Sequence, residues 1–170
     1  DREAKVAGQR SEFVRTVWDN AGSVPLLFGA SNLVRIADRC VTPANIRAFA
    51  NRGLSGIDGT IATAIGIAGA GQGVRALIGD LTLLHDVGSL NLSGLRNLNV
   101  QLIVGNDSGG QIFRKLEVAK SVSKELFEQL FITPQKVDIE ALAKAFGWQY
   151  EKPASSQELV AAMKLEGFVI

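Results

Sequence analysis

Two apolar stretches decide the fold: Val-Arg-Ala-Leu-Ile-Gly-Asp-Leu at residues 74–81 and Val-Gln-Leu-Ile-Val-Gly-Asn-Asp-Ser-Gly-Gly-Gln-Ile-Phe at residues 100–113. Each opens with an apolar run of strand length and then turns to glycine and a carboxylate or amide. Such runs are typical of strands buried on both faces of a parallel sheet. Ligands of open α/β sheets bind beyond the carboxyl ends of the strands. The pattern therefore predicts that Asp80 and the Asn106–Asp107 pair face one site.

The residue types at this edge predict a hard cation. Two carboxylates brought together repel each other unless a cation lies between them, and all-oxygen ligation favours Mg²⁺ or Ca²⁺. The backbone N–H groups of Leu81 and Thr82 open a helix directly after a strand, which is an anion site by geometry and dipole. The plainer alternative is that Asp80 and Thr82 are helix caps and that residues 106–107 form a turn.

The rest of the chain alternates strands and helices. Apolar runs predict further strands at 24–28, 46–50, 148–150 and 168–170. Helical spacing predicts helices from Ser11 and at 33–39, 60–70, 90–95, 125–131, 138–146 and 158–165, with caps at Ser31, Asp58, Asp138 and Ser155 or Ser156. Residues 1–9 are expected to fray, and the charged section 114–124 is expected to be mobile. The alternation predicts one α/β domain with a mostly parallel central sheet and helices on both faces.

Composition excludes several classes of protein. A chain of 170 residues is large enough for one domain with a real core, and a net charge of +1 gives no nucleic-acid or anionic-membrane signal. The longest weakly polar run, 61–71, is too short to span a bilayer. Cys40 is the only cysteine, which excludes an internal disulfide and favours a reducing cytoplasm. We expect Cys40 to be inert and the single histidine, His85, to be structural or solvent-facing.

Two further strings make the pattern specific: Asn-Arg-Gly-Leu-Ser-Gly-Ile-Asp-Gly at 51–59 and Gly-Gly-Gln-Ile-Phe at 109–113. With them, the Gly-Asp and Asn-Asp pairs resemble the diphosphate–metal motif of thiamin diphosphate enzymes. Taken together, these motifs are similar to the C-terminal domain of the SEPHCHC synthase (MenD) family, over residues from about 20 to 140. The resemblance implies that residues 1–170 form a single thiamin diphosphate-binding domain, the C-terminal third of a longer enzyme.

The resemblance also implies an activity and a set of site residues. The activity is a transferase step of menaquinone biosynthesis: decarboxylation of 2-oxoglutarate and addition of the succinyl-semialdehyde carbanion to isochorismate. A Mg²⁺ or Mn²⁺ ion is implied on the carboxylates of Asp80 and Asp107 and the carbonyl of Gly109. The motif has asparagine where this chain has Asp107, so the chain adds a negative charge there.

The implied cofactor-binding residues are Ile57, Gly79, Asp80, Leu81, Thr82, Asp107 and Gly109. The implied substrate-binding residues are Ser31, Arg35, Arg52, Gln111, Ile112, Phe113 and Leu116.

By the same resemblance, no catalytic residue is expected in this chain. The glutamate that activates thiamin belongs to the N-terminal domain of a partner subunit in a homo-oligomer. The chain alone is then expected to be inactive, with an apolar face of Ile57, Ile112, Phe113 and Leu116 left open.

The sequence also suggests three other interpretations. One is a different thiamin diphosphate-dependent decarboxylase or synthase domain, such as an acetolactate-type synthase. Another is a non-catalytic, flavodoxin-like module that binds Mg²⁺ and phosphate. Such a module needs a lysine at the end of a strand, and no such lysine follows any of the predicted strands, which disfavours this interpretation. A dinucleotide site at 66–73 is rejected because its glycines end a helix instead of opening one.

Overall fold

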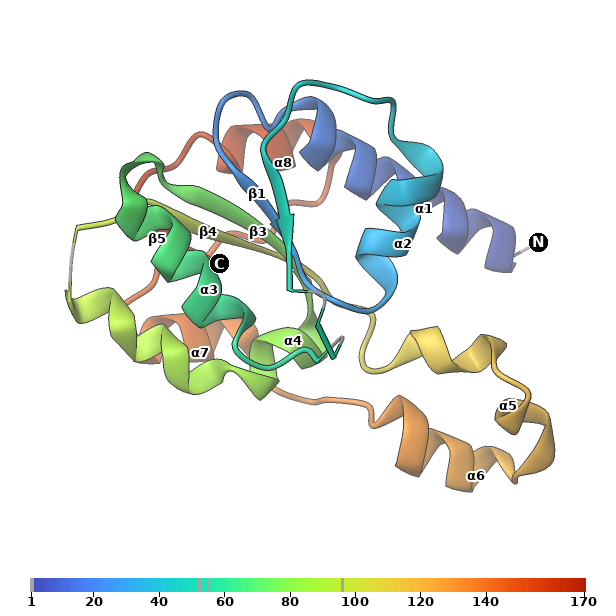
Figure 1. The fold of residues 1–170 in the computed structure, drawn as a ribbon. Helices are drawn as coiled ribbons and strands as arrows, with labels where there is room; N and C mark the ends of the chain where they lie inside the picture. The colour runs from blue at the N-terminus through green and yellow to red at the C-terminus, as the bar shows by residue number, and fades with distance from the viewer. Residues whose placement is uncertain (1, 52, 55, 96) are drawn as a thin grey trace.

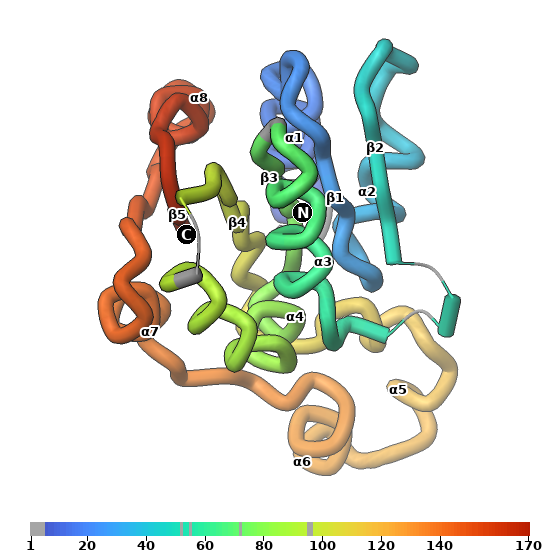
Figure 2. Tube along the Cα trace, turned by 60° about the vertical axis from the view of Figure 1, so that its left-hand side comes forward, coloured from blue at the N-terminus to red at the C-terminus, as the bar shows by residue number. Residues whose placement is uncertain are grey.

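The computed structural model describes residues 2–170 except 52, 55 and 96, and it confirms the predicted α/β fold. A five-stranded, all-parallel sheet lies between helices on both faces (Figure 1). Its strands are β1 (Leu26–Phe28), β2 (Ala48–Ala50), β3 (Val74–Gly79), β4 (Val100–Gly105) and β5 (Phe168–Val169). They lie side by side in the order β2-β1-β3-β4-β5 (Figure 2). β3 and β4, the strands of the two apolar stretches at 74–81 and 100–113, are neighbours and pair from Val74↔Val100 to Gly79↔Gly105.

The helices divide into two layers because strand side chains alternate between the two faces of the sheet. Leu27, Ala76, Ile78 and Leu102 share one apolar core with α3 (Thr60–Ile67), α4 (Asp80–His85), the 3₁₀ segment η2 (Val87–Leu95) and α7 (Ile139–Ala145). Leu26, Phe28, Leu77 and Ile103 share the other core with α1 (Arg2–Asp19), α2 (Asn32–Cys40) and α8 (Ser156–Ala162). Burial on both faces explains why β3 and β4 are almost continuously apolar. No helix in the described part of the chain has the length and apolar character needed to cross a bilayer.

An arm of residues 111–132 leaves the layered body near the carboxyl ends of the strands (Figure 1). It consists of η3 (Gln111–Lys115), α5 (Val118–Ser121), α6 (Lys124–Phe127) and η4 (Glu128–Ile132). The helix predicted at 125–131 is therefore present as α6 and η4, and the section expected to be mobile contains η3 and α5. Phe131 packs on Phe127 and Phe113, with ring centroids 5.2 and 6.0 Å apart.

Several predicted boundaries and caps were wrong. Residues 2–9, expected to fray, belong to α1. The helix predicted at 60–70 is α3 followed by the π-helical segment η1 (Ala68–Gln72). Ser31 occupies the cap position of α2 but makes no side-chain capping bond, and the N-cap of α3 is Gly59, not Asp58. The strand predicted at 148–150 is only a bridge from Gln149 to Val169.

Two predicted caps are confirmed. The Asp138 carboxylate accepts the N–H of Ala141 at 3.1 Å, and the Ser155 hydroxyl accepts the N–H of Glu158 at 3.2 Å. Both bonds satisfy donors that a helix leaves unpaired in its first turn.

A polar network fastens two helices of one layer, α1 and α8, to the amino-terminal end of the sheet. Arg75 on β3 donates to Gln101 on β4 and to the carbonyls of Ala21 and Met163, each at 2.7 Å. Gln101 is buried and donates in turn to the carbonyl of Leu165 at 2.7 Å. The network therefore satisfies the carbonyls at the carboxyl ends of α1 and α8, which the helices cannot satisfy themselves.

We predict that Gln101→Leu will lower the free energy of unfolding by about 2–3 kcal/mol, because it leaves a buried carbonyl and the Arg75 Nε–H without their partner. Gln157→Leu, an exposed position on α8, is the matched control and should stay within about 0.5 kcal/mol of the parent. Urea denaturation followed by circular dichroism measures both. Equal stability of the two variants would show that the network does not stabilise the fold.

Candidate functional site

The predicted site residues follow neighbouring strands. Because Gly79 at the end of β3 pairs with Gly105 at the end of β4, Asp80 and the turn at 106–109 emerge side by side. The strand order adds a second feature. After β1 the chain forms β2 on one side of β1, and it then crosses to form β3 on the other side of β1. The carboxyl ends of β1 and β3 therefore flank a topological switch point, where open α/β sheets bind ligands.

Asp80 is a buried carboxylate at the start of α4. Its side chain is 5% exposed, and its Oδ2 accepts the N–H of Gly109 at 2.7 Å. Burial raises the pKa of Asp80 above its ordinary value, and the negative charge of Asp107 adds to the rise. The N–H groups of Gly109 and Leu81 act in the opposite direction by hydrogen-bonding the charged form. The negative charge of Asp107 is thus near enough to Asp80 to act on its pKa.

Gly109 stands where only glycine fits. Its φ is 114°, and a Cβ there would lie 2.2 Å from the carbonyl oxygen of Ile132. Its N–H is the donor to Asp80, and its carbonyl accepts the N–H of Gln111 at 2.8 Å. The N–H of Gly110 donates to the Ile132 carbonyl at 2.7 Å. Both ends of the arm are therefore fixed at the same point, directly beside Asp80.

Asp107 is half-buried and paired with an arginine from a distant helix. Arg10 on α1 places Nη2 2.7 Å and Nε 2.9 Å from Oδ1 of Asp107. The Asp107 carbonyl accepts the side-chain amide of Gln111 at 3.1 Å, and Asn106 accepts the N–H of Ser108 in a tight turn. No motif pointed to Arg10, which lies beside the section expected to fray.

The cofactor residues Gly79, Leu81 and Thr82 also lie at this edge. Gly79 ends β3 and is the N-cap of α4, while Thr82 is buried. The Leu81 backbone lies next to the Asp80 carboxylate and acts to lower the pKa of that group. His85 ends α4 and is exposed, in agreement with a solvent-facing role.

Predicted residues outside the arm and the Asp80 edge lie in the loops that follow β1 and β2. Ser31, after β1, has φ 100° and ψ −132°, a conformation that non-glycine residues rarely adopt. Arg35 is exposed and donates to the Ser31 carbonyl, so the two residues are joined as their spacing predicted. Ile57 is half-buried in the loop after β2, and its carbonyl accepts the Thr60 hydroxyl at 3.1 Å. Arg52 lies outside the described residues.

The arm carries the other four predicted substrate-binding residues. Gln111 and Ile112 are half-buried, whereas Phe113 and Leu116 are 37% and 48% exposed. Arg114 links them to the return limb of the arm: its Nε donates to Gln111 at 2.6 Å and its Nη2 to Glu128 at 2.7 Å. The base of the arm is thus tied to the Asp107 turn, and its outer apolar side chains face solvent.

Asp86, at the end of α4, performs the capping role predicted for Asp58. Its Oδ2 accepts the N–H groups of Ile61 and Ala62 at 2.6 and 3.0 Å, and its Oδ1 accepts the Ser89 hydroxyl at 2.6 Å. The carboxylate therefore joins the end of α4 to the start of α3. These bonds fix the start of α3 relative to the helix that Asp80 opens.

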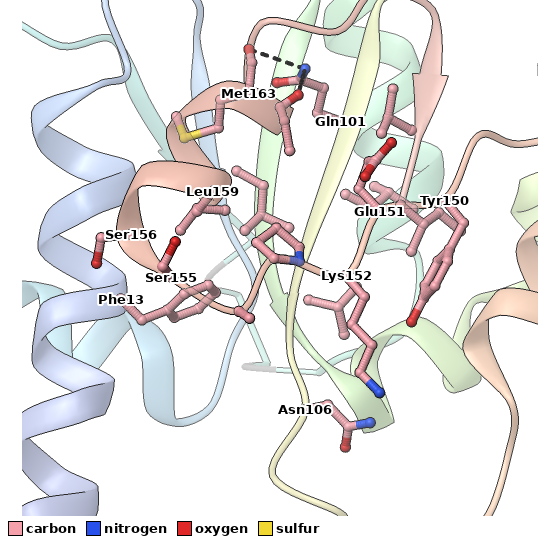
Figure 3. A pocket seen from close by; sticks show the side chains of 18 of the residues that line it. Phe13, Gln101, Asn106, Tyr150, Glu151, Lys152, Ser155, Ser156, Leu159 and Met163 are labelled. Carbon is pink, nitrogen blue, oxygen red and sulfur yellow. Dashed lines mark hydrogen bonds between the residues drawn. The ribbon is translucent and has the colours of Figure 1, made fainter.

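A separate hollow of about 460 Å³ lies beside β4, between α1, α8 and the segment 150–156 (Figure 3). It follows the part of β4 beyond Gln101, where β5 no longer pairs. Its walls are mostly apolar, with Phe13, Leu159 and Met163 on one side, while Lys152 extends toward Asn106. Among the described residues, Asn106 is the one that belongs both to the lining of this hollow and to the predicted site.

The described residues contain no group of three or more His, Cys, Asp or Glu side chains arranged to hold a metal ion. The two carboxylates, Asp80 and Asp107, are the only acidic ligands of the predicted set. A cation here would therefore depend on backbone carbonyls, water and ligand oxygens to complete its shell.

The chain is similar to known proteins over most of its length. Residues 29–168 match the family described as thiamine pyrophosphate enzyme, C-terminal TPP binding domain. The chain is 47% identical to a 2-succinyl-5-enolpyruvyl-6-hydroxy-3-cyclohexene-1-carboxylate synthase from Clavibacter michiganensis subsp. michiganensis, over 91% of this chain and 28% of that protein. It is 49% identical to the protein of the same name from Leifsonia xyli subsp. xyli, over 81% of this chain and 25% of that protein. The chain thus spans about a quarter of the length of these relatives.

The fold is also similar to a solved structure. The thiamine diphosphate-dependent 4-hydroxybenzoylformate decarboxylase of Rhodococcus jostii RHA1 aligns with a TM-score of 0.77 at 14% identity, over 94% of this chain and 31% of that one. At this identity the likeness shows the fold alone. None of these comparisons supports the flavodoxin-like alternative.

We predict that Asp86→Ala will destabilise the chain by about 1–3 kcal/mol, because two N–H groups at the start of α3 lose their acceptor. Asp58→Ala should cost much less, because Asp58 does not cap α3. Thermal unfolding of the two variants compares them directly. If Asp58→Ala were the more damaging change, the capping assignment would be wrong.

Proposed function

Because the chain belongs to the family of C-terminal TPP binding domains of thiamine pyrophosphate enzymes, we propose that it is the cofactor-binding domain of a 2-succinyl-5-enolpyruvyl-6-hydroxy-3-cyclohexene-1-carboxylate synthase. The identities of 47% and 49% to proteins of that name support this specificity. We place the domain in the C-terminal part of the longer enzyme, as the family description indicates. The observation that carries the proposal is the meeting of Asp80 with the 106–109 turn at the carboxyl edge of β3 and β4.

The donor set at this edge fits a Mg²⁺ or Mn²⁺ ion. A buried carboxylate beside a second carboxylate is costly unless a cation offsets it, and the raised pKa of Asp80 reflects that cost. We assign Asp80, Asp107 and the Gly109 carbonyl as the protein ligands. That carbonyl already accepts one N–H, from Gln111, and a carbonyl oxygen has a second lone pair. The ion would hold the diphosphate of the cofactor.

The other residues of the edge serve cofactor and substrates in this proposal. Thiamin diphosphate supplies, when bound, the electron sink for the carbon from which CO₂ leaves. Gly79, Leu81 and Thr82 line the diphosphate side, and Ile57 supports the thiamin. Ser31 and Arg35, with Arg52, bind the carboxylates of 2-oxoglutarate and isochorismate. The strained backbone of Ser31 supports this role, because such conformations cluster at functional sites.

Gln111, Ile112, Phe113 and Leu116 would close the site from the arm. The exposure of Phe113 and Leu116 supports a partner surface at this position. We propose that the N-terminal domain of a second subunit in a homo-oligomer covers these side chains and supplies the glutamate that activates thiamin. A cytoplasmic location agrees with the free thiol of Cys40.

A chimera tests the proposed function. In the Clavibacter michiganensis relative, this chain replaces the segment to which it aligns. We expect the chimera to convert 2-oxoglutarate and isochorismate, and the 170-residue chain alone to release no CO₂ from 2-oxoglutarate with added thiamin diphosphate and Mg²⁺.

In the chimera, Asp80→Asn should lower kcat/KM about a hundredfold or more. The amide keeps an acceptor for the Gly109 N–H but lacks the charge that the cation needs. Asp19→Asn, an exposed change at the far end of α1, is the control and should leave kcat/KM unchanged. Full activity of the Asp80→Asn chimera, or decarboxylation by the chain alone, would overturn the proposal.

A further inference from the structure

The Arg10–Asp107 pair brings a cation of the protein itself to the proposed metal and diphosphate site. Arg10 lies 97 residues from Asp107 in sequence and reaches it from α1. The helix holds it there, because Val14 and Val17, one and two turns further along the same face, are fully buried against the sheet. Both side chains of the pair are about one quarter exposed. The contact is therefore more sheltered than the surface ion pairs that contribute little.

The charges at this point explain why a fixed arginine is useful. Asp80 and Asp107 carry two negative charges, and a diphosphate bound beside them adds more. A divalent ion offsets the two carboxylates but leaves the diphosphate without compensation. One guanidinium on Asp107 reduces the protein's own contribution to a single negative charge, which lowers the repulsion felt by an incoming anion.

The geometry keeps Asp107 available to a metal. Both Arg10 contacts, from Nε and from Nη2, fall on Oδ1. A carboxylate has a second oxygen with its own lone pairs, so Oδ2 remains for a cation while Oδ1 stays on the arginine. A guanidinium that gripped both oxygens would have competed with the metal instead.

We propose that Arg10 is a positioning residue of this site: it orients Asp107 through Oδ1 and offsets its charge, so that the metal-loaded site accepts a diphosphate. The inference rests on the function proposed above. It makes a specific claim, because the need for Arg10 should exist only while residue 107 carries a negative charge. Asparagine at that position would supply an oxygen ligand of the same shape without the charge.

The test is a double-mutant cycle in the full-length chimera, with Arg10→Ala, Asp107→Asn and both changes together. Two titrations are measured for each variant: Mn²⁺ alone, by electron paramagnetic resonance, and thiamin diphosphate in saturating Mg²⁺, by calorimetry. Arg10→Ala should weaken thiamin diphosphate binding about tenfold, while Mn²⁺ alone binds equally or more tightly. In the Asp107→Asn background, the same change should alter the diphosphate affinity less than about threefold.

Two controls separate this role from a general loss of charge or of structure. Arg15→Ala removes a charge from an exposed position of the same helix and should leave both affinities within about twofold. Arg10→Lys keeps the charge and should retain most of the diphosphate affinity. Equal effects of Arg10→Ala in both backgrounds, or a parallel loss of Mn²⁺ affinity, would overturn the inference. A parent chimera that binds neither Mn²⁺ nor thiamin diphosphate would instead contradict the proposed function.

Discussion

The bond from the Gly109 N–H to the buried carboxylate of Asp80 is the contact on which the site depends. It joins the end of β3 to the turn after β4, and through Gly110 and Ile132 it fixes both ends of the arm. A carboxylate in such a place lowers stability unless its charge is offset. The fold tolerates the cost because the register of β3 and β4 leaves Asp80 and the 106–109 turn no other position. Stability is thus given up at the point where the chain is proposed to hold a cation, as is common at functional sites.

Around this contact, the surrounding elements act as supports. Asp86 fixes the start of α3, and with it the loop that carries Ile57, to the far end of the helix that Asp80 opens. At the amino-terminal ends of the strands, Arg75 and Gln101 hydrogen-bond to the carboxyl ends of α1 and α8. Because α1 is held at its carboxyl end, Arg10 in the amino-terminal half of the helix reaches Asp107 from a fixed direction. The outer arm residues Phe113 and Leu116 stay exposed, since nothing in the described chain covers them.

Most of the fold and the centre of the site could be predicted from sequence because both follow from short-range patterns. The apolar runs before Gly79 and Gly105 indicated buried parallel strands, and the residues directly after them marked the edge that ligands use. What the sequence did not reveal were contacts between distant segments. Arg10 sits in a polar section with no motif, and Asp86 caps a helix that precedes it by 25 residues. Asp58 was the natural local candidate for that cap, and tertiary structure supplied a better acceptor. The N-terminal turns of α1 also form against expectation, because a polar sequence says little about where a helix begins.

The most direct measurement of the central claim is a crystal structure of the chain soaked with Mn²⁺ and thiamin diphosphate, with data collected at the manganese absorption edge. We expect one anomalous peak at the carboxyl edge of β3 and β4, bounded by Asp80, Asp107 and the Gly109 carbonyl, about 2.1–2.2 Å from their oxygens. We also expect the diphosphate on the opposite side of the ion and Arg10 still on Asp107. A manganese peak elsewhere on the molecule, with the bond between Asp80 and the Gly109 N–H undisturbed and no density beside it, would show that this edge is not the metal site.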